Sequence, residues 1–174
     1  MEGKCIIVMG VSGSGKTTVG KALAKKIKAS FIDGDDMHPQ ANKDKMHSGQ
    51  PLNDEDRKEW LENINRKARE ITANGADCVF ACSALKFYYR QQLRKGLTKI
   101  VFIYLKGSYS FILERVQSRK NHFMPVGLLQ SQFDTLEEPT ADEKDVLTVP
   151  IRVSADKVVK EVVDALAVYF DERY

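Results

Sequence analysis

Long apolar runs are missing from this chain of 174 residues. No stretch approaches the roughly 18 apolar residues that a membrane-spanning helix needs. The first apolar run, residues 5–9, is short and lies beside the charged residues Glu2 and Lys4, which argues against a cleaved signal peptide. We therefore expect a cytoplasmic protein with no membrane partner. Internal repeats and low-complexity segments are also absent, so the simplest expectation is one domain over residues 1–174.

Cysteine is scarce, with Cys5, Cys78 and Cys82 as the complete set. An odd count without paired short spacings does not suit a disulfide framework, and the three histidines share no metal-ligand spacing with the cysteines. Each cysteine lies in an apolar, strand-like run. The pattern therefore favours buried, reduced thiols over disulfides or a zinc site.

Charge of one sign is nowhere concentrated, because 27 basic and 24 acidic residues are mixed along the chain and leave a net charge of +3. A polybasic block that would follow nucleic acid is lacking, so we expect no nucleic-acid partner. The N-K-x-D pattern that specifies guanine in GTPases is also missing, which weighs against a GTP-dependent switch protein.

A phosphate-binding pattern is present at residues 10–17, where GVSGSGKT fits G-x-x-x-x-G-K-[ST] at every fixed position. Backbone N–H groups of such a loop point at phosphate oxygens, while Lys16 reaches the β- and γ-phosphates and Thr17 offers a hydroxyl to Mg²⁺. The alternative is a Gly/Ser turn before an amphipathic helix, but the preceding apolar run and the following helical pattern match the context of the motif. The predicted nucleotide-binding residues are Gly10, Ser12, Gly13, Ser14, Gly15, Lys16, Thr17 and Thr18.

Apolar runs alternate with helical patterns along the rest of the chain. The runs at about 4–9, 31–32, 77–81, 100–105 and 145–149 predict five parallel strands, the first of them central because it is apolar throughout. The predicted fold is therefore α/β, with a five-stranded parallel sheet flanked by helices. With the phosphate loop after its first strand, it resembles the three-layer P-loop kinase fold, which implies a short helical lid.

Carboxylates follow the second strand, at the sheet edge where ligands of open α/β folds bind. A solvated turn explains them equally well in isolation, but the phosphate loop one unit upstream favours catalysis. If the strand end is extended, Asp33 and Asp35 point the same way along the pleat. Two carboxylates would repel unless a cation or a hydroxyl shares the charge, so we assign Asp33 to Mg²⁺ and Asp35 to the acceptor hydroxyl.

Cations recur at two later places. Lys86 and Arg90 are four residues apart, so on one helix face they could hold an anion, although a solvated face is the alternative. Arg115, Arg119 and Lys120 precede a second helix, which suggests a lid over about 119–132 that excludes water from ATP phosphates. A helix C-terminus also attracts basic residues, so the charges alone give the lid modest support.

Three blocks carry a finer resemblance. They are DGDxxHPxxNxxKMxSGxPLxDxDRxxWL at 33–61, CSALKxxYR at 82–90, and HF at 122–123 followed by LLxSQFxTLExP at 128–139. Together with the phosphate loop they resemble gluconokinases, among the small P-loop kinases of the adenylate and shikimate kinase kind. One departure is Glu59, where that family usually has proline before the tryptophan.

The resemblance implies transfer of the ATP γ-phosphate to the terminal hydroxyl of D-gluconate, with Mg²⁺ as cofactor, a substrate-binding segment at about 37–75, and a homodimer. Residue by residue it implies Lys16, Asp35 and Arg119 as catalytic; Arg115, Arg119 and Lys120 as further nucleotide ligands; Asp35, His38, Lys86, Arg90 and His122 as acceptor ligands; and Thr17 with Asp33 on the metal. The alternatives are another small-molecule or nucleoside monophosphate kinase, or a nucleotide-binding switch protein.

Overall fold

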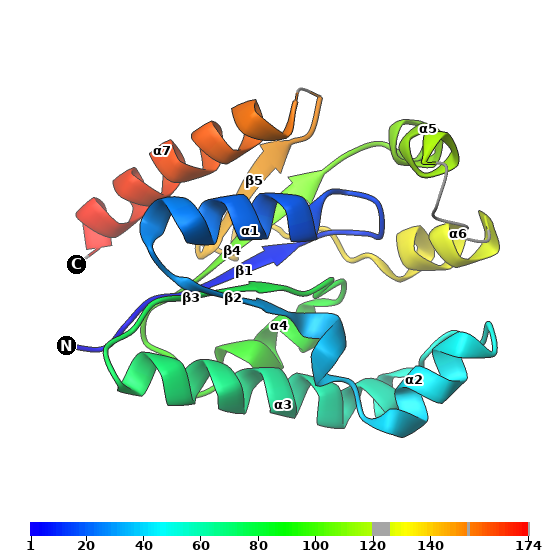
Figure 1. Cartoon of the computed structure of the whole chain (residues 1–174), viewed down its shortest axis with the longest axis horizontal. Coiled ribbons are helices and arrows are strands. Elements are labelled where there is room, and N and C mark those ends of the chain that lie inside the picture. The colour runs from blue at the N-terminus through cyan, green and yellow to red at the C-terminus, as the bar shows by residue number, and fades with distance from the viewer. Residues whose placement is uncertain (120–125, 153, 174) are drawn as a thin grey trace.

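The computed structural model describes residues 1–119, 126–152 and 154–173. A five-stranded sheet in the order β2-β3-β1-β4-β5 forms its centre, and every pair of neighbouring strands is parallel (Figure 1). The strands are β1 (Cys5–Met9), β2 (Ser30–Asp33), β3 (Cys78–Ala81), β4 (Ile100–Lys106) and β5 (Val146–Pro150). The predicted fold class is confirmed, and the first strand is the central one.

Helices cover both faces of the sheet, which gives three layers. One face carries α1 (Lys16–Ile27) and α7 (Ala155–Arg173), and the other carries α3 (Asp54–Ala73) and α4 (Phe87–Arg94). The remaining helices stand beyond the carboxyl ends of the strands, on the right in Figure 1. They are α2 (Gln40–His47), α5 (Tyr109–Ser118) and α6 (Val126–Thr135), with the short 3₁₀ turn η1 (Gly34–Met37) directly after β2.

The two faces of the sheet have separate apolar cores, divided by the alternation of side chains along each strand. Ile6 and Val8 of β1 pack with α1 and α7, whereas Ile7 and Met9 pack with α3 and α4. Because both faces are covered, β1 is buried along its whole length, which explains its uninterrupted apolar sequence. All three cysteines are free and buried, as the sequence predicts.

Loops at the carboxyl ends of the strands converge on one edge of the sheet. The phosphate-binding loop leaves β1 there, η1 leaves β2, and residues 82–86 leave β3 toward α4. The element order thus brings three segments that are far apart in sequence to one place. Within the described residues, no helix combines the length and the apolar character that crossing a membrane requires.

Candidate active site

The phosphate-binding loop joins β1 to the N-terminus of α1. No side chain caps this helix, and its first turn contains no acidic residue, so its first backbone N–H groups are left for another partner. The hydroxyl of Ser14 is buried and has no hydrogen-bond partner in the part of the chain that the structure describes. An uncapped helix N-terminus beside an unpaired buried hydroxyl fits a bound phosphate group.

Lys16 lies over its own loop, where its Nζ atom donates a hydrogen bond to the carbonyl oxygen of Val11 at 2.9 Å. Burial lowers the pKa of Lys16, and the nearby groups of Asp35, Cys82 and Asp33 act in the opposite direction. The ammonium group and the carboxylates after β2 are therefore close enough to influence one another. This is the arrangement expected where a cation meets a transferring phosphoryl group.

Asp33 and Asp35 do lie together, but not as two neighbours on one pleat. Asp33 ends β2, whereas Asp35 belongs to η1, so the expectation of an extended backbone is wrong. The side chain of Asp33 caps η1 by accepting a hydrogen bond from the Asp35 backbone N–H at 3.0 Å. An aspartate side chain can accept a hydrogen bond from a backbone N–H group two residues further on, and this local contact favours a turn over a continued strand.

Gly34 lets this turn approach the neighbouring strand. A Cβ atom at Gly34 would lie 2.4 Å from the carbonyl oxygen of Ala81, so no side chain fits there. On its other side, the Gly34 carbonyl accepts a hydrogen bond from Trp60 Nε1 at 2.7 Å.

Partial burial and the adjacent charge of Asp33 raise the pKa of Asp35, while Lys16 opposes them. Asp35 is thus held in place as an exposed carboxylate with an enhanced affinity for a proton.

His38 is a buried, neutral side chain that stacks on Trp60. Its ring stacks on Trp60 with 4.4 Å between centroids, and its Nδ1 atom lies 3.2 Å from the amide nitrogen of Asn42. Because that amide group can only donate, the ring proton belongs on Nε2. Burial, followed by the positive charges of Arg57 and Lys43, lowers the pKa of His38 to about 4. The side chain can therefore act as a positioned, uncharged donor.

Lys86 is the N-cap residue of α4 rather than part of the helix, and it faces the start of α3. Its Nζ atom forms an ion pair with Asp54 at 2.9 Å, and Tyr89 donates a hydrogen bond to the same carboxylate. Arg57 in turn donates to the Tyr89 hydroxyl at 3.0 Å. These hydrogen bonds from Tyr89 and Lys86 lower the pKa of Asp54. The result is a partly exposed polar cluster of residues 54, 57, 86 and 89.

The sequence analysis did not assign roles to Asp54, Arg57 or Tyr89. The positive charge of Arg57 helps to lower the pKa of His38 and opposes the raised pKa of Cys82, so this residue lies near both side chains. Asp54 and Arg57 are three residues apart in a helix, and that spacing was the available signal. Tyr89 comes from a different helix, so only the fold brings it to them.

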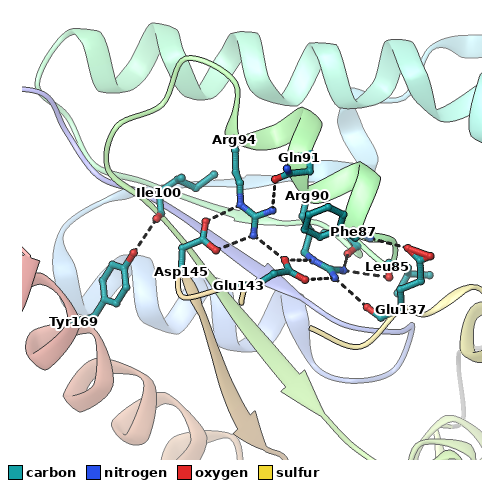
Figure 2. A network of polar contacts seen from close by, with 11 residues as sticks. Leu85, Phe87, Arg90, Gln91, Arg94, Ile100, Glu137, Glu143, Asp145 and Tyr169 are labelled. Atoms are coloured by element: carbon teal, nitrogen blue, oxygen red, sulfur yellow. Dashed lines mark hydrogen bonds and ion pairs between the residues drawn. The ribbon is translucent and has the colours of Figure 1, made fainter. Parts of the chain in front are cut away.

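Arg90 corrects the prediction of two cations on one helix face. Its side chain is fully buried, and Nε and Nη2 bind the two oxygens of Glu143 at 2.8 and 2.6 Å (Figure 2). The remaining donors reach the carbonyl oxygens of Ala84, Leu85 and Glu137. All five guanidinium hydrogens are thereby used. Arg90 supports the loop before α4 and does not present a free cation to an acceptor.

Arg115 lies on the nucleotide side, beside the phosphate loop. A Cβ atom at Gly15 would be 3.7 Å from Arg115 Nη2, and Arg115 shares a narrow hollow with Thr18 and Ile151. Burial and the charge of Arg119 lower the pKa of Arg115. Arg119 follows α5 and is exposed. The predicted ligands Lys120 and His122 lie outside the described residues.

Comparisons with known proteins show the family to which the chain belongs. The family model for shikimate kinase matches residues 12–167. The thermosensitive gluconokinase of Escherichia coli K12 is 50% identical over 151 residues, which cover 87% of this chain and 81% of the relative. The thermoresistant gluconokinase of the same organism is 45% identical, covering 92% of this chain and 91% of the relative.

Solved structures give the same grouping. A gluconokinase from Sinorhizobium meliloti 1021 superposes with a TM-score of 0.87 at 41% identity, covering 97% of each chain. A shikimate kinase from Aquifex aeolicus has a TM-score of 0.59 at 17% identity, which shows a shared fold only. The fold and the site define a P-loop kinase. In this class the phosphate-binding loop after β1 and the carboxylates at the end of β2 lie at the same edge of a parallel sheet. Within that class, the chain belongs to the shikimate kinase family and groups with the gluconokinases of that family.

Proposed function

We propose that the protein is an ATP:D-gluconate 6-phosphotransferase, producing 6-phosphogluconate. The observation that carries the chemistry is the placement of Lys16, Asp33 and Asp35 at one sheet edge, where the Asp33 and Asp35 charges act on the pKa of Lys16 and the Lys16 and Asp33 charges act on the pKa of Asp35. The choice of D-gluconate is supported by relatives named gluconokinases at 40–50% identity over most of the chain.

The nucleotide side is assigned to residues 10–18 with Arg115 and Arg119. Backbone N–H groups at the start of α1 and the Ser14 hydroxyl would hold phosphate oxygens, and Arg115 would lie against the base. Lys16 would stabilise the charge that develops on the transferring group. Arg119 belongs to the proposed lid over about 119–132, together with Lys120 from outside the described part of the chain.

Mg²⁺ is assigned to Thr17 and Asp33. Hydroxyl and carboxylate oxygens are the hard ligands that this ion prefers, and it usually keeps several waters and phosphate oxygens instead of a protein cage. Within the described residues no cluster of three or more His, Cys, Asp or Glu side chains is found that could hold a metal ion. When bound, the ion would neutralise phosphate charge.

The acceptor side is assigned to Asp35, His38, Lys86 and, from the structure, Arg57. Asp35 would orient the terminal hydroxyl and accept its proton, a role that its raised pKa supports. Lys86 and Arg57 supply positive charge for a sugar-acid carboxylate, and neutral His38 supplies a hydrogen-bond donor. His122 remains a proposal from outside the described residues, and Arg90 is not retained as a ligand.

We also propose a cytoplasmic homodimer built from one kinase domain over 1–174, with the acceptor segment at about 37–75. The dimer is supported by the exposed rings of Phe87 and Tyr88 on α4, which are the kind of apolar surface that subunit contacts cover. Light scattering on the purified chain tests this part.

The function itself is tested by a coupled assay with ATP, Mg²⁺ and a panel of acceptors: D-gluconate, shikimate, D-glucose and AMP. We expect formation of 6-phosphogluconate and ADP with D-gluconate and little turnover with the others. Preferential phosphorylation of AMP or shikimate would replace the assignment with another kinase. ATP hydrolysis at the same rate without any acceptor would favour a nucleotide-binding switch protein.

A further inference from the structure

The side-chain amide of Gln132, on α6, is paired with the tip of the phosphate-binding loop. Its Oε1 atom accepts a hydrogen bond from the Ser12 backbone N–H at 2.6 Å, and its Nε2 atom donates to the Ser12 hydroxyl at 2.8 Å. A backbone N–H can only donate, so the amide oxygen must face it and the amide nitrogen must face the hydroxyl. Two directional bonds thus join residues that are 120 positions apart.

The same loop tip is packed from a second side by α5. Gly13 has a φ of +80°, and a Cβ atom there would lie 2.6 Å from Val116 Cγ2. No side chain fits between the loop and this helix. The loop tip is therefore held between an apolar contact with α5 and a polar contact with α6, and the polar contact is the part that a single side chain controls.

The other end of α6 is joined to the loop that carries Lys86. The backbone continues from Gln132 to Leu136 by a helical hydrogen bond of 2.9 Å, and the next residue, Glu137, donates its N–H to the Leu85 carbonyl at 2.8 Å. The Glu137 carboxylate accepts from the Phe87 N–H, and its carbonyl accepts from Arg90, as Figure 2 shows.

These contacts form a continuous hydrogen-bonded connection from Ser12, through residues 132–137, to Leu85. Ala84, the residue before Leu85, has a φ of +46°, a strained value for a residue other than glycine. Arg90 binds the Ala84 carbonyl at 2.9 Å and helps to hold this conformation. The acceptor-side loop is therefore a defined backbone conformation that depends on the segment following α6.

We propose that Gln132 is a positioning residue for phosphoryl transfer, which ties the tip of the phosphate-binding loop to the acceptor-side loop at residues 82–87. It fixes Ser12 above the bound phosphates and, through Glu137, the placement of Lys86. Nucleotide binding then strengthens acceptor binding, and by thermodynamic reciprocity the acceptor strengthens nucleotide binding by the same factor. The part of this inference that concerns acceptor binding rests on the proposed gluconate site.

The test compares Gln132→Leu, which keeps the size of the side chain but loses both hydrogen bonds, with Gln130→Leu. Gln130 lies on the same helix, is exposed, and bonds only to Asp134 among the described residues. Calorimetry measures the Kd of D-gluconate with and without a non-hydrolysable ATP analogue. We expect the analogue to tighten gluconate binding by about 5-fold or more in the wild type and in Gln130→Leu, and by less than about 2-fold in Gln132→Leu.

Steady-state kinetics gives a second readout. Loss of positioning should lower kcat and raise the KM for both substrates in Gln132→Leu, with a melting temperature equal to that of Gln130→Leu. In the Ser12→Ala and Gln132→Leu double variant, the two losses should add only in part, because Ser12→Ala removes one of the two hydrogen bonds that Gln132→Leu removes. If the leucine variant does not fold, Gln132→Ala provides the same comparison.

A third readout is independent of the acceptor. The backbone N–H of Phe87 donates a hydrogen bond to the Glu137 carboxylate. Its hydrogen exchange should slow when the ATP analogue alone is added to the wild type, but not when it is added to Gln132→Leu. Failure of gluconate to bind would overturn the proposed function. The hydrogen-exchange measurement at Phe87 needs no gluconate, so it would still test whether Gln132 connects the two loops. Equal exchange and equal coupling in the wild type and Gln132→Leu, or no coupling in the wild type, would overturn the inference.

Discussion

The nucleotide and acceptor sides of the site are constructed differently. The phosphate-binding loop is a run of consecutive residues between β1 and α1, and it offers mainly backbone N–H groups. The acceptor side gathers Asp35 from η1, Arg57 from α3 and Lys86 from the loop before α4, and it depends on side chains. Few single substitutions remove a backbone N–H group, whereas one substitution removes a side-chain ligand outright. Variants on the two sides should therefore fail in different ways.

The largest effect is expected on the nucleotide side, from Lys16→Ala. Removing the cation assigned to the transferring phosphoryl group should lower kcat by about 10³–10⁵-fold, the range that an arginine finger contributes to the same kind of transfer. The fold should persist, because α1 retains its buried residues Val19, Leu23 and Ala24. Measurement of kcat together with the melting temperature checks both statements.

Lys25→Ala is the matched control for that experiment, since Lys25 is exposed on the same helix. It should leave kcat within about 2-fold, because surface substitutions away from special features have small effects. Retention of most wild-type turnover by Lys16→Ala would remove the phosphate-binding loop from the mechanism.

Asp35→Asn should produce the next largest loss. The amide keeps the shape of the side chain but cannot accept the hydroxyl proton, and positioned proton acceptors contribute about 10²–10⁴-fold to kcat. The KM for ATP should change little. The measurement is kcat and both KM values over a range of Mg²⁺ concentrations.

Asp33→Asn gives the contrasting case, because Asp33 is assigned to the metal. Its turnover should need more Mg²⁺ and recover in part at high Mg²⁺. A defect of Asp35→Asn that Mg²⁺ rescues would show that the two aspartates have the opposite roles.

Arg90 and Lys86 provide the sharpest contrast within the acceptor side. Arg90→Met leaves the buried Glu143 without one of its partners and removes support from three carbonyl groups, so it should cost about 3–5 kcal/mol of the free energy of unfolding. Lys86→Met breaks a partly exposed ion pair, which is worth about 0–1 kcal/mol, but it should raise the KM for gluconate. Urea unfolding and steady-state kinetics on both variants test the difference.

A result in which Arg90→Met keeps full stability and loses only gluconate affinity would restore Arg90 as an acceptor ligand. The network around it predicts otherwise. Arg94 also binds Glu143 and Asp145, at 2.8 and 2.7 Å, so Arg90 belongs to a set of buried and part-buried ion pairs that joins α4 to the segment before β5 (Figure 2). Burial alone would raise the pKa of Glu143, but the hydrogen bonds from Arg90 and Arg94 outweigh it and lower that pKa.

The same contrast explains what could be predicted from the sequence. The five strands and the phosphate loop follow from patterns within short windows, and the central position of β1 follows from its apolar run. The role of Arg90 could not be predicted, because its partner Glu143 is 53 residues away and helical spacing alone cannot separate a solvated face from a buried one. The pattern of residues 31–35 is compatible with an extended strand end and with a turn, and it does not show that the Asp33 side chain caps η1.

The smallest expected effect concerns His38 and the dependence of stability on pH. Its pKa is about 4 in the folded protein and near 6.5 when unfolded. The unfolded chain therefore binds a proton that the folded chain does not, and the stabilisation is complete above pH 6.5 and declines as the pH falls toward 4. Between pH 6.5 and pH 4 the free energy of unfolding falls by an amount on the order of 2–3 kcal/mol.

His38→Gln should flatten this part of the plot of unfolding free energy against pH, whereas His47→Gln, a change at an exposed position on α2, should leave it unchanged. Urea unfolding between pH 4 and 7 measures the slopes. Equal slopes for the wild type and His38→Gln would mean that His38 carries its charge in the folded state, and the acceptor side would then offer a cation where a neutral donor is proposed.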